Sequence, residues 1–325
     1  MKVFISTFPF GDVDRRPLVW LEENGVEYTL NNYGRKMTEG ELAEVIDDYD
    51  VLIAGTEPIS NKVLNNAKKL RLISRVGIGL DSVDLIGAKN RNIDVSYTPD
   101  APSPAVAELT IGLMLALIRH VHESTEAMRR GKWVRKVGTR LSESVVGILG
   151  IGRIGKLVIN HLEGFHCKQL LLHDIDDAIN IETKLKHSWC DLETLLSESD
   201  ILSIHVPLTS ITNNLIGKNQ LNMMKADSIL INTARGGIVN EEDLYEVLKS
   251  GHLSGAAIDV FCDEPYVGPL ALLSQCILTA HMGSMSADCR LNMEEQATME
   301  VIRLAKGEPL ENSVPIDEYE LRIHH

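Results

Sequence analysis

Three side chains in this sequence have the types that a proton-transfer site needs, and each follows a short apolar run. Arg235 comes after SILINTA, Glu264 after AAIDVFCD, and His281 after CILTA. An arginine offers a planar fork of donors to a carboxylate, a histidine exchanges a proton near neutral pH, and a carboxylate on its second ring nitrogen holds the tautomer. Singly, each has an ordinary interpretation: a packing arginine, an acid in a turn or a structural histidine. Together they indicate acid–base chemistry.

A glycine-rich stretch supplies a second possible binding element. After the apolar run VVGIL, Gly150, Gly152 and Gly155 form GxGxxG at a predicted strand-to-helix junction. The first glycine permits a tight turn, the second lets the backbone approach a pyrophosphate, and the third lets the helix pack on the strand. The N–H groups of Arg153 and Ile154 then begin the helix and favour an anion. Glycines here could serve packing alone, but the flanking strands favour a dinucleotide site.

The acid Asp174 selects among dinucleotides. It closes a second apolar strand predicted at 169–173, about 20 residues past the last glycine, where a carboxylate can bond both ribose hydroxyls. The stretch HDIDD at 173–177 places further carboxylates where a 2′-phosphate would need a cation. The sequence therefore favours NAD over NADP as the cofactor.

The elements that must position these residues alternate between strands and helices. Short apolar runs and helical patterns follow one another from Lys2 to about residue 98, and again from Val145 to His281. This repeated βα pattern predicts parallel sheets with helices on both faces. Ligands of a doubly wound sheet bind outside the carboxyl ends of its strands, so the three residues could converge beside the cofactor. We predict an α/β fold of two doubly wound parallel-sheet domains, Rossmann-like or flavodoxin-like.

A proline-punctuated connector divides the two regions. Pro99, Pro102 and Pro104 precede a long apolar helical pattern at 105–120, for which Ser103 is the expected N-cap. The forty residues after Met285 are too few for a domain and should return to pack on the first region. We expect a substrate domain of residues 1–100 and 286–325, an NAD-binding domain of residues 101–285, and a cleft between them that closes over the substrate.

Composition excludes several classes of function. The net charge of -14, without a basic tract, disfavours nucleic acid or an anionic membrane as a partner. The five cysteines are widely spread with no CxxC pair, so we expect neither a disulfide framework nor a metal site, and a reducing cytoplasm. No stretch approaches the roughly 18 apolar residues of a membrane span, and the N-terminal apolar run is too short for a secretion signal.

Over essentially its full length the chain resembles the D-isomer-specific 2-hydroxyacid dehydrogenase family, and within it the phosphoglycerate dehydrogenases that lack a C-terminal regulatory domain. The resemblance rests on eight motifs: RVGIGLDSVD (75–84), AVAELTIGLML (105–115), GKWVRK (131–136), GILGIGRIGK (147–156), HVPLT (205–209), INTARGGIVNEEDL (231–244), AAIDVFCDEP (256–265) and HMGS (281–284). It implies a split substrate domain, an inserted NAD-binding domain, and reversible hydride transfer between the nicotinamide and a D-2-hydroxy acid.

The resemblance also implies residue roles. His281 would be the acid/base, Glu264 its partner, and Arg235 the ligand of the substrate's carboxylate and carbonyl oxygens. Backbone N–H groups of Ile78 and Gly79 would hold the carboxylate, although RVGIGLD could be a plain turn. The implied cofactor contacts, beyond the glycine motif and Asp174, are Val206, Pro207, Ala234, Asp259, His281 and Gly283. Asp259 could instead be a satisfied buried acid, and HVPLT could be only a strand that its proline ends.

The substrate is the finer question. Arg75 immediately precedes the carboxylate-binding loop, and Arg135 matches a basic position of the phosphoglycerate enzymes and could reach across a dimer. Both lead us to expect a second anionic group, as in 3-phosphoglycerate or phosphohydroxypyruvate; either could be an ordinary surface cation. Two departures oppose this. Glu57 stands in AGTEPIS where those enzymes tend to place an arginine, and Pro102 where a substrate-contacting Asn often sits. Glu57 must point away or mark a different substrate, such as hydroxypyruvate or glyoxylate.

A partner is expected as well. The helix at 105–120 is too uniformly apolar for a solvent-facing connector, and the family pairs through its NAD-binding domains, so we predict a homodimer with 105–141 in its interface. A few members of the family act instead as NAD-sensing corepressors, whose output is a protein partner. This alternative, a binding protein without turnover, stays open on the sequence.

Overall fold

The computed structural model describes residues 1–176 and 179–320 and divides the chain into two units. Unit 1 comprises Met1–Pro102 and Met285–His325, and unit 2 comprises Ser103–Ser284. These limits lie within two residues of the predicted domain boundaries. Each unit is built on one parallel sheet, so the predicted α/β class with two parallel sheets is confirmed.

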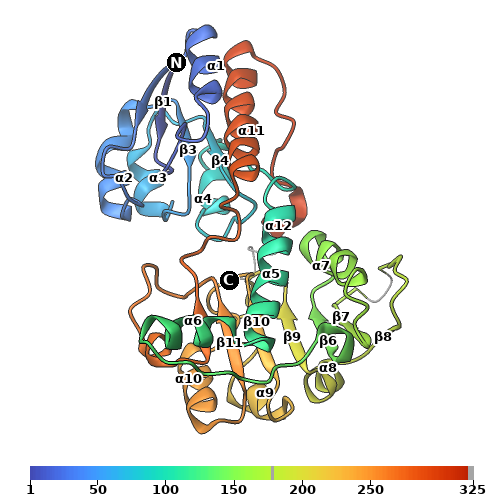
Figure 1. Ribbon diagram of the computed structural model, residues 1–325. Helices are drawn as coiled ribbons and strands as arrows, with labels where there is room; N and C mark the ends of the chain where they lie inside the picture. Colours follow the sequence, from blue (N-terminus) through green and yellow to red (C-terminus); the bar gives the residue numbers. More distant parts are fainter. Residues whose placement is uncertain (177–178, 321–325) are drawn as a thin grey trace. The chain divides into compact units, whose positions relative to one another are not determined.

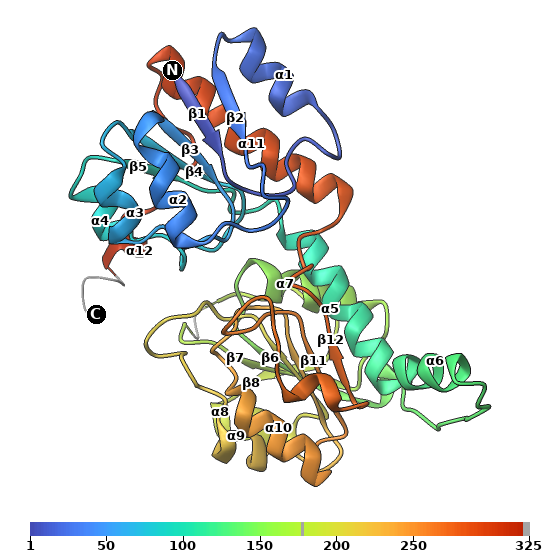
Figure 2. The ribbon, with the colours of Figure 1, turned by 90° about the vertical axis from the view of Figure 1, so that its left-hand side faces the viewer.

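Unit 1 is a five-stranded sheet in the order β2-β1-β3-β4-β5. Its elements are β1 (Lys2–Ile5), α1 (Arg16–Glu23), β2 (Glu27–Leu30), α2 (Glu39–Val45), η1 (Ile46–Asp48), β3 (Val51–Ala54), α3 (Asn61–Asn66), β4 (Leu72–Arg75), α4 (Leu85–Lys89), β5 (Asp94–Ser96), α11 (Ala287–Lys306) and α12 (Ile316–Glu320). Helices α2 and α3 pack together on one face, while α1 and α11 pack on the other (Figure 2). The C-terminal segment then joins β5, because Tyr97 N donates to Asn312 O and Val314 N to Val95 O.

Unit 2 is a seven-stranded sheet in the order β12-β11-β10-β9-β6-β7-β8. Its elements are α5 (Ser103–Ile118), α6 (Val121–Arg129), η2 (Leu141–Glu143), β6 (Val145–Leu149), α7 (Arg153–Glu163), β7 (Gln169–His173), β8 (His187–Trp189), α8 (Leu192–Glu198), β9 (Ile201–Ile204), α9 (Lys218–Met223), β10 (Ile229–Asn232), α10 (Glu241–Ser250), β11 (Gly255–Ile258), η3 (Pro269–Leu272) and β12 (Cys276–Leu278) (Figure 1). The strand order turns back between β6 and β9, which makes the sheet doubly wound.

Alternation along the strands of unit 2 builds two cores. Val146 and Ile148 of β6 face the helices α5 and α7, whereas Leu149 faces the side that α8, α9 and α10 cover. This division follows from the period of two in a strand, which sends successive side chains to opposite faces. Because both faces are covered by helices, β9 and β10 are fully buried, β6 is buried except at Val145, and all three are predominantly apolar.

Local capping signals explain several helix limits. Thr38 and Glu41 form a capping box at the start of α2. At the start of α10 the side chain of Asn240 accepts from Asp243 N, and Gly251 ends the helix with φ +79°. The predicted cap at Ser103 is wrong: Ser103 is itself the first residue of α5, and its hydroxyl is buried with no hydrogen-bond partner among the described residues.

The long apolar helix α5 has a structural explanation within its own unit. It packs on α7 and on strands β10 and β11, and Ala107, Met114 and Leu117 are among its buried residues. The apolar composition from which we predicted a place in a dimer interface is therefore satisfied by burial inside unit 2. Among the described residues no single helix is long and apolar enough to span a membrane; α5 with α6, bent by 65°, passes only as a pair, on length and composition.

Candidate active site

The catalytic candidates of unit 2 stand at the carboxyl ends of three neighbouring strands. Arg235 follows β10, Glu264 follows β11 and His281 follows β12, and these strands are paired in that order. Parallel strands bring their carboxyl ends to one edge of the sheet, so residues far apart in the sequence meet there. The structure thereby brings the turns that carry these three residues together, from segments that no local pattern links.

His281 and Glu264 form a direct pair. Nδ1 of His281 lies 2.9 and 3.0 Å from the two carboxylate oxygens of Glu264. Both side chains are partly exposed, at 31 % for His281 and 21 % for Glu264, so the pair remains accessible. Glu264 is oriented in turn by Phe261, whose N–H donates to its Oε1 over 3.2 Å. A carboxylate on Nδ1 fixes the tautomer and leaves Nε2 as the nitrogen that can exchange a proton with a substrate.

The turn that carries Arg235 is shaped by a buried asparagine that sequence reasoning missed. Asn232, 1 % exposed, accepts from Ala234 N and donates from Nδ2 to Arg235 O, over 3.1 and 2.9 Å. Beyond it, a Cβ on Gly236 would lie only 2.0 Å from the carbonyl carbon of Phe261, so the Arg235 turn packs directly on the turn that leads to Glu264. A polar residue that closes an otherwise apolar strand, as in ILIN, is the signal that could have identified Asn232.

The loop of His281 is held by Asp259, which is 1 % exposed. Its Oδ1 accepts from Thr279 Oγ1 and from Met282 N, and its Oδ2 accepts from Gly283 N. The sequence left open a contact with the cofactor's carboxamide or a satisfied buried acid. Both oxygens are engaged within the chain, and three of the roughly four acceptor positions of a carboxylate are used, so both alternatives stay open.

The glycine motif adopts the geometry that a dinucleotide site needs. Gly150 has φ +96°, and a Cβ there would lie 2.8 Å from the backbone of His205 and Val206, so only glycine fits. A Cβ on Gly155 would lie 2.1 Å from Gly150 O, which shows how closely α7 approaches β6. At Gly152, by contrast, a Cβ would meet nothing within 4 Å, and no side chain caps the start of α7. An open approach to an uncapped helix start suits a pyrophosphate.

The remaining predicted cofactor residues lie along the same edge. Asp174 follows β7, is half-buried, and accepts from Ile151 N of the glycine turn over 2.6 Å. Val206 and Pro207 follow β9, the strand beside β6, and Ala234 and Gly283 lie in the two turns described above. Of the acids in HDIDD, Asp177 lies outside the described residues. The predicted cofactor and catalytic residues of unit 2 thus form one continuous row along the carboxyl edge of its sheet, from β7 to β12.

His205, next to this row, is an unusual buried histidine. Its Nε2 lies 2.8 Å from Ser203 Oγ, and its Nδ1 is buried without a hydrogen-bond partner among the described residues. Burial lowers the pKa of His205 to about 3, so the ring is neutral at physiological pH. A neutral His205, whose Nδ1 is buried, is a poor candidate for proton exchange with a substrate.

In unit 1 the predicted carboxylate-binding loop follows β4. Thr98 fixes its start, because its Oγ1 accepts from Gly77 N over 2.8 Å. Ile78 and Gly79 are half-buried, and neither N–H donates to an acceptor within the part of the chain that the structure describes. Two adjacent N–H groups without a protein acceptor are the kind of donors that an anion binds.

The two charged residues beside this loop are both buried. Arg75 is 4 % exposed and donates from Nη1 to Val76 O, so its interpretation as an ordinary surface cation is wrong. Glu57 is 1 % exposed and accepts from Ser6 Oγ and, over 2.9 Å, from Gly55 N. Glu57 therefore points into unit 1 and ties the loop after β3 to the loop after β1.

Arg135 lies in unit 2, in an extended segment between α6 and η2. It is exposed, and so are its apolar neighbours Trp133 (79 %), Val134 and Val137 (96 %). Figure 2 shows α6 and this segment projecting from the side of unit 2. Because no other element of the unit covers them, these apolar side chains form a face that a partner could bury.

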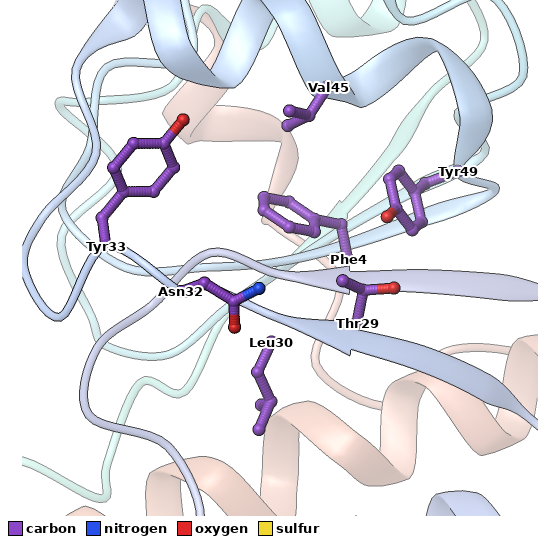
Figure 3. Close-up of a pocket in the computed structure, with 7 residues that line it drawn as sticks. All are labelled: Phe4, Thr29, Leu30, Asn32, Tyr33, Val45 and Tyr49. Atoms are coloured by element: carbon purple, nitrogen blue, oxygen red, sulfur yellow. The ribbon is translucent and has the colours of Figure 1, made fainter.

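A separate hollow of about 350 Å³ lies in unit 1, at the edge formed by β1 and β2 (Figure 3). Its lining is Phe4, Thr29, Leu30, Asn32, Tyr33, Val45 and Tyr49. None of these is a predicted site residue or carries a charge, so the hollow offers no counter-ion to a carboxylate substrate. Over residues 1–176 and 179–320 no cluster of three or more His, Cys, Asp or Glu side chains could hold a metal ion.

Comparison with known proteins adds sequence relatives to this geometry. The profile described as "D-isomer specific 2-hydroxyacid dehydrogenase, NAD binding domain" matches residues 111–283. The chain is 35 % identical over 288 residues to a D-3-phosphoglycerate dehydrogenase of Methanocaldococcus jannaschii, covering 86 % of this chain but only 54 % of that protein. It is 38 % identical over 278 residues to a glyoxylate reductase of Thermofilum pendens, covering 82 % of each.

Among solved structures, the TT0316 protein from Thermus thermophilus superposes with a TM-score of 0.88 at 33 % identity, over 97 % of this chain and all of that one. Similar relatives are thus named both as phosphoglycerate dehydrogenases and as glyoxylate or hydroxypyruvate reductases. The glycine turn and Asp174 stand inside the matched NAD-binding region, as do Arg235, Glu264 and His281.

Proposed function

The chain belongs to the D-isomer specific 2-hydroxyacid dehydrogenase family, and we propose that it uses NADH to reduce a small, unphosphorylated 2-keto acid of the glyoxylate or hydroxypyruvate type. The pairing of His281 with Glu264 at 2.9 Å supports the acid–base part of this proposal. Relatives named glyoxylate reductase or hydroxypyruvate reductase support the substrate class.

In reduction, protonated His281 gives its Nε2 proton to the carbonyl oxygen, and in oxidation the same nitrogen takes the hydroxyl proton. Glu264 stabilises the imidazolium through Nδ1, while Arg235 orients the carboxylate and the carbonyl oxygen. In unit 1, the N–H groups of Ile78 and Gly79 are donors that suit a carboxylate. The nicotinamide, when bound, supplies or accepts the hydride.

One observation carries the choice of an unphosphorylated substrate. Arg75, the cation of unit 1 for which we predicted a phosphate contact, is 4 % exposed and donates to Val76 O. A substrate phosphate would require an accessible fork of donors, and a buried guanidinium that already donates to the backbone is poorly placed to provide it. Glu57 is turned inward, where its carboxylate accepts from Ser6 Oγ and Gly55 N.

A phosphorylated substrate, 3-phosphoglycerate or phosphohydroxypyruvate, is the second candidate. Arg135 favours it, since this residue is exposed and could meet an anion from another subunit. The relatives named D-3-phosphoglycerate dehydrogenase also favour it, although the chain spans only 54 % and 60 % of their length.

Initial rates with NADH across glyoxylate, hydroxypyruvate, phosphohydroxypyruvate and pyruvate test the two candidates. We expect the highest kcat/KM with hydroxypyruvate or glyoxylate, and little change in Arg135→Ala. A preference for phosphohydroxypyruvate that Arg135→Ala narrows would establish the second candidate instead. Absence of turnover with every acid would favour an NAD-sensing binding protein.

We also propose a homodimer that pairs through unit 2. The exposed apolar side chains of Trp133, Val134 and Val137, with Val121 and Met128 of α6, support an interface on this segment rather than on α5. Sedimentation at micromolar concentration should give a dimer, and Trp133→Asp should give a monomer. A wild-type monomer would contradict the proposal.

A further inference from the structure

The loop that presents His281 is held in an uncommon backbone conformation. His281 has φ +49°, in the left-handed region that side chains with a Cβ rarely adopt. Its N–H donates to Asp259 O over 2.8 Å and to Thr279 O over 3.1 Å. A residue in this region keeps its conformation only when the surrounding contacts determine it.

Asp259 supplies most of them from one position. Its carboxylate accepts from three donors that lie on both sides of His281: Thr279 Oγ1 at 2.5 Å, Met282 N at 2.9 Å and Gly283 N at 2.9 Å. With its carbonyl, which accepts from His281 N, Asp259 thus contacts the loop at four points between 279 and 283. At 1 % exposure these bonds are not replaced by water.

Asp259 is itself bonded to β10, the strand that leads into the Arg235 turn. Asp259 N donates to Asn232 O over 3.0 Å, and Asn232 shapes the turn of Arg235. On the other side, a Cβ on Gly283 would lie 3.1 Å from Asp259 Oδ2 and 3.2 Å from Val106 Cγ2, so the loop is packed closely onto the carboxylate. A small change at Asp259 would therefore move the backbone of His281.

We propose that Asp259 is the positioning residue of His281: its buried carboxylate holds the 279–283 loop so that the imidazole keeps its place beside Glu264. This role rests on the proposed function, and it adds the residue that orients the acid/base. Asp259 acts through the loop and need not touch the substrate or the cofactor.

Asp259→Asn tests the proposal with almost no change of volume. The amide brings an N–H donor against the N–H donors of the loop, so at least one of the three bonds is lost. We expect kcat to fall about 100-fold, because a displacement of about 1 Å at a reacting group has that effect. The dissociation constant for NADH, measured by fluorescence titration, should stay at its wild-type value.

Thr279 provides a matched pair of variants that does not touch the carboxylate. Thr279→Val keeps the shape and removes the hydroxyl donor, and we expect about a 10-fold lower kcat. Thr279→Ser keeps the donor and should retain wild-type kcat. If Asp259→Asn does not fold, this pair still tests the positioning role. A decrease in kcat in Thr279→Ser as large as that in Thr279→Val would overturn the proposal.

A direct contact with the cofactor's carboxamide predicts a different pattern. In that case Asp259→Asn would weaken NADH binding and leave kcat nearly unchanged. It would also abolish any preference of the wild type for NADH over the analogue in which an acetyl group replaces the carboxamide. Either result would overturn the positioning role.

The NMR signals of the His281 ring, assigned by their loss in His281→Ala, give a readout that needs no turnover. They should move in Asp259→Asn and Thr279→Val but not in Thr279→Ser; unchanged signals in the first two would overturn the proposal. If the wild type turned over none of the keto acids, the proposed function would fail, and these signals would still decide whether Asp259 positions His281.

Discussion

The carboxyl edge of the unit 2 sheet has two halves that are built in different ways. The cofactor half is built mainly from one continuous stretch, 145–174, in which Gly155 packs on Gly150 O and Asp174 accepts from Ile151 N. The catalytic half takes Arg235, Glu264 and His281 from the ends of three strands. Its bonds join different segments, as from Asp259 N to Asn232 O and from His281 to Glu264.

This difference implies that the two halves can fail separately. A change in the cofactor half acts on a local turn and should alter nucleotide binding. A change in the catalytic half acts on a network of buried polar groups and should alter proton transfer, while the nucleotide still binds. The following substitutions test that separation, in order of decreasing expected effect.

His281→Ala should have the largest effect and confine it to chemistry. General acid–base catalysis contributes about 100- to 10,000-fold, so kcat should fall by a factor in that range. NADH binding should stay near wild type, because the glycine turn and Asp174 belong to the other half. Turnover measured with the preferred keto acid and fluorescence titration with NADH check the two statements.

The control for this substitution is His187→Ala, an exposed histidine in β8 of the same unit, which should keep full activity. If His281→Ala retained more than about a tenth of the wild-type rate, well short of the contribution of an acid–base group, the acid–base role would be wrong. A parallel loss of NADH binding would show that the two halves are not separable.

Local patterns predicted the secondary-structure elements of the cofactor half well. The strand at 169–173 and the helix after the glycine turn agree with β7 and α7, and the α/β class with parallel sheets follows from the βα alternation. These features depend on residues close in the sequence: apolar runs, turn glycines and an acid at a set distance. The candidate catalytic residues Arg235, Glu264 and His281 were predicted as strand-end residues in motifs of the family.

What holds the catalytic half in place could not be predicted in the same way. The contacts of Asp259 and Asn232 depend on the order of strands in the sheet and on loop geometry, neither of which a linear pattern contains. Burial was misjudged for the same reason. Arg75 was expected either to meet a phosphate or to be an ordinary surface cation, yet it is buried.

The cofactor half should discriminate NAD from NADP. A 2′-phosphate would lie against Asp174 and, next to it, Asp176, and repulsion between like charges of several kcal/mol gives a preference for NAD on the order of 100-fold in kcat/KM. Asp174→Ser should narrow this preference and leave kcat with saturating NADH nearly unchanged. Equal or better efficiency of the wild type with NADP would contradict the assignment.

His205 lies where the two halves meet, and its effect should be on stability. The pKa of His205 is about 3 in the folded protein and about 6.5 in the unfolded chain. Below pH 6.5 the unfolded chain therefore binds a proton that the folded protein does not, and the free energy of unfolding decreases as the pH falls towards 3. At pH 5 the loss should be about 2 kcal/mol. Urea unfolding at pH 7 and pH 5, followed by the fluorescence of half-buried Trp189 in the same unit, measures it.

His205→Gln is the reference for that measurement, since glutamine does not titrate. The variant should be less stable than the wild type at pH 7, because the contact with Ser203 is altered. Between pH 7 and pH 5, however, its free energy of unfolding should decrease by about 2 kcal/mol less than that of the wild type. An identical loss in both proteins would mean that the acid sensitivity arises from other groups.

Glu264→Gln should give the smallest effect, and it sharpens the comparison most because it changes charge within the catalytic half without changing shape. The amide can still accept from Phe261 N and contact Nδ1 of His281, so orientation is largely kept. What is lost is the charge that stabilises the imidazolium, worth about 10-fold in the rate of reduction for one charge-assisted hydrogen bond. Because reduction needs protonated His281, the pH above which the rate declines should move lower.

The exposed neighbour Asp263 provides the control, since Asp263→Asn removes the same charge one residue away and should leave the pH profile of the rate unchanged. A profile that moved equally in both variants would indicate a general field effect, and an unmoved profile in Glu264→Gln would refute the role of Glu264 as the partner of the acid/base.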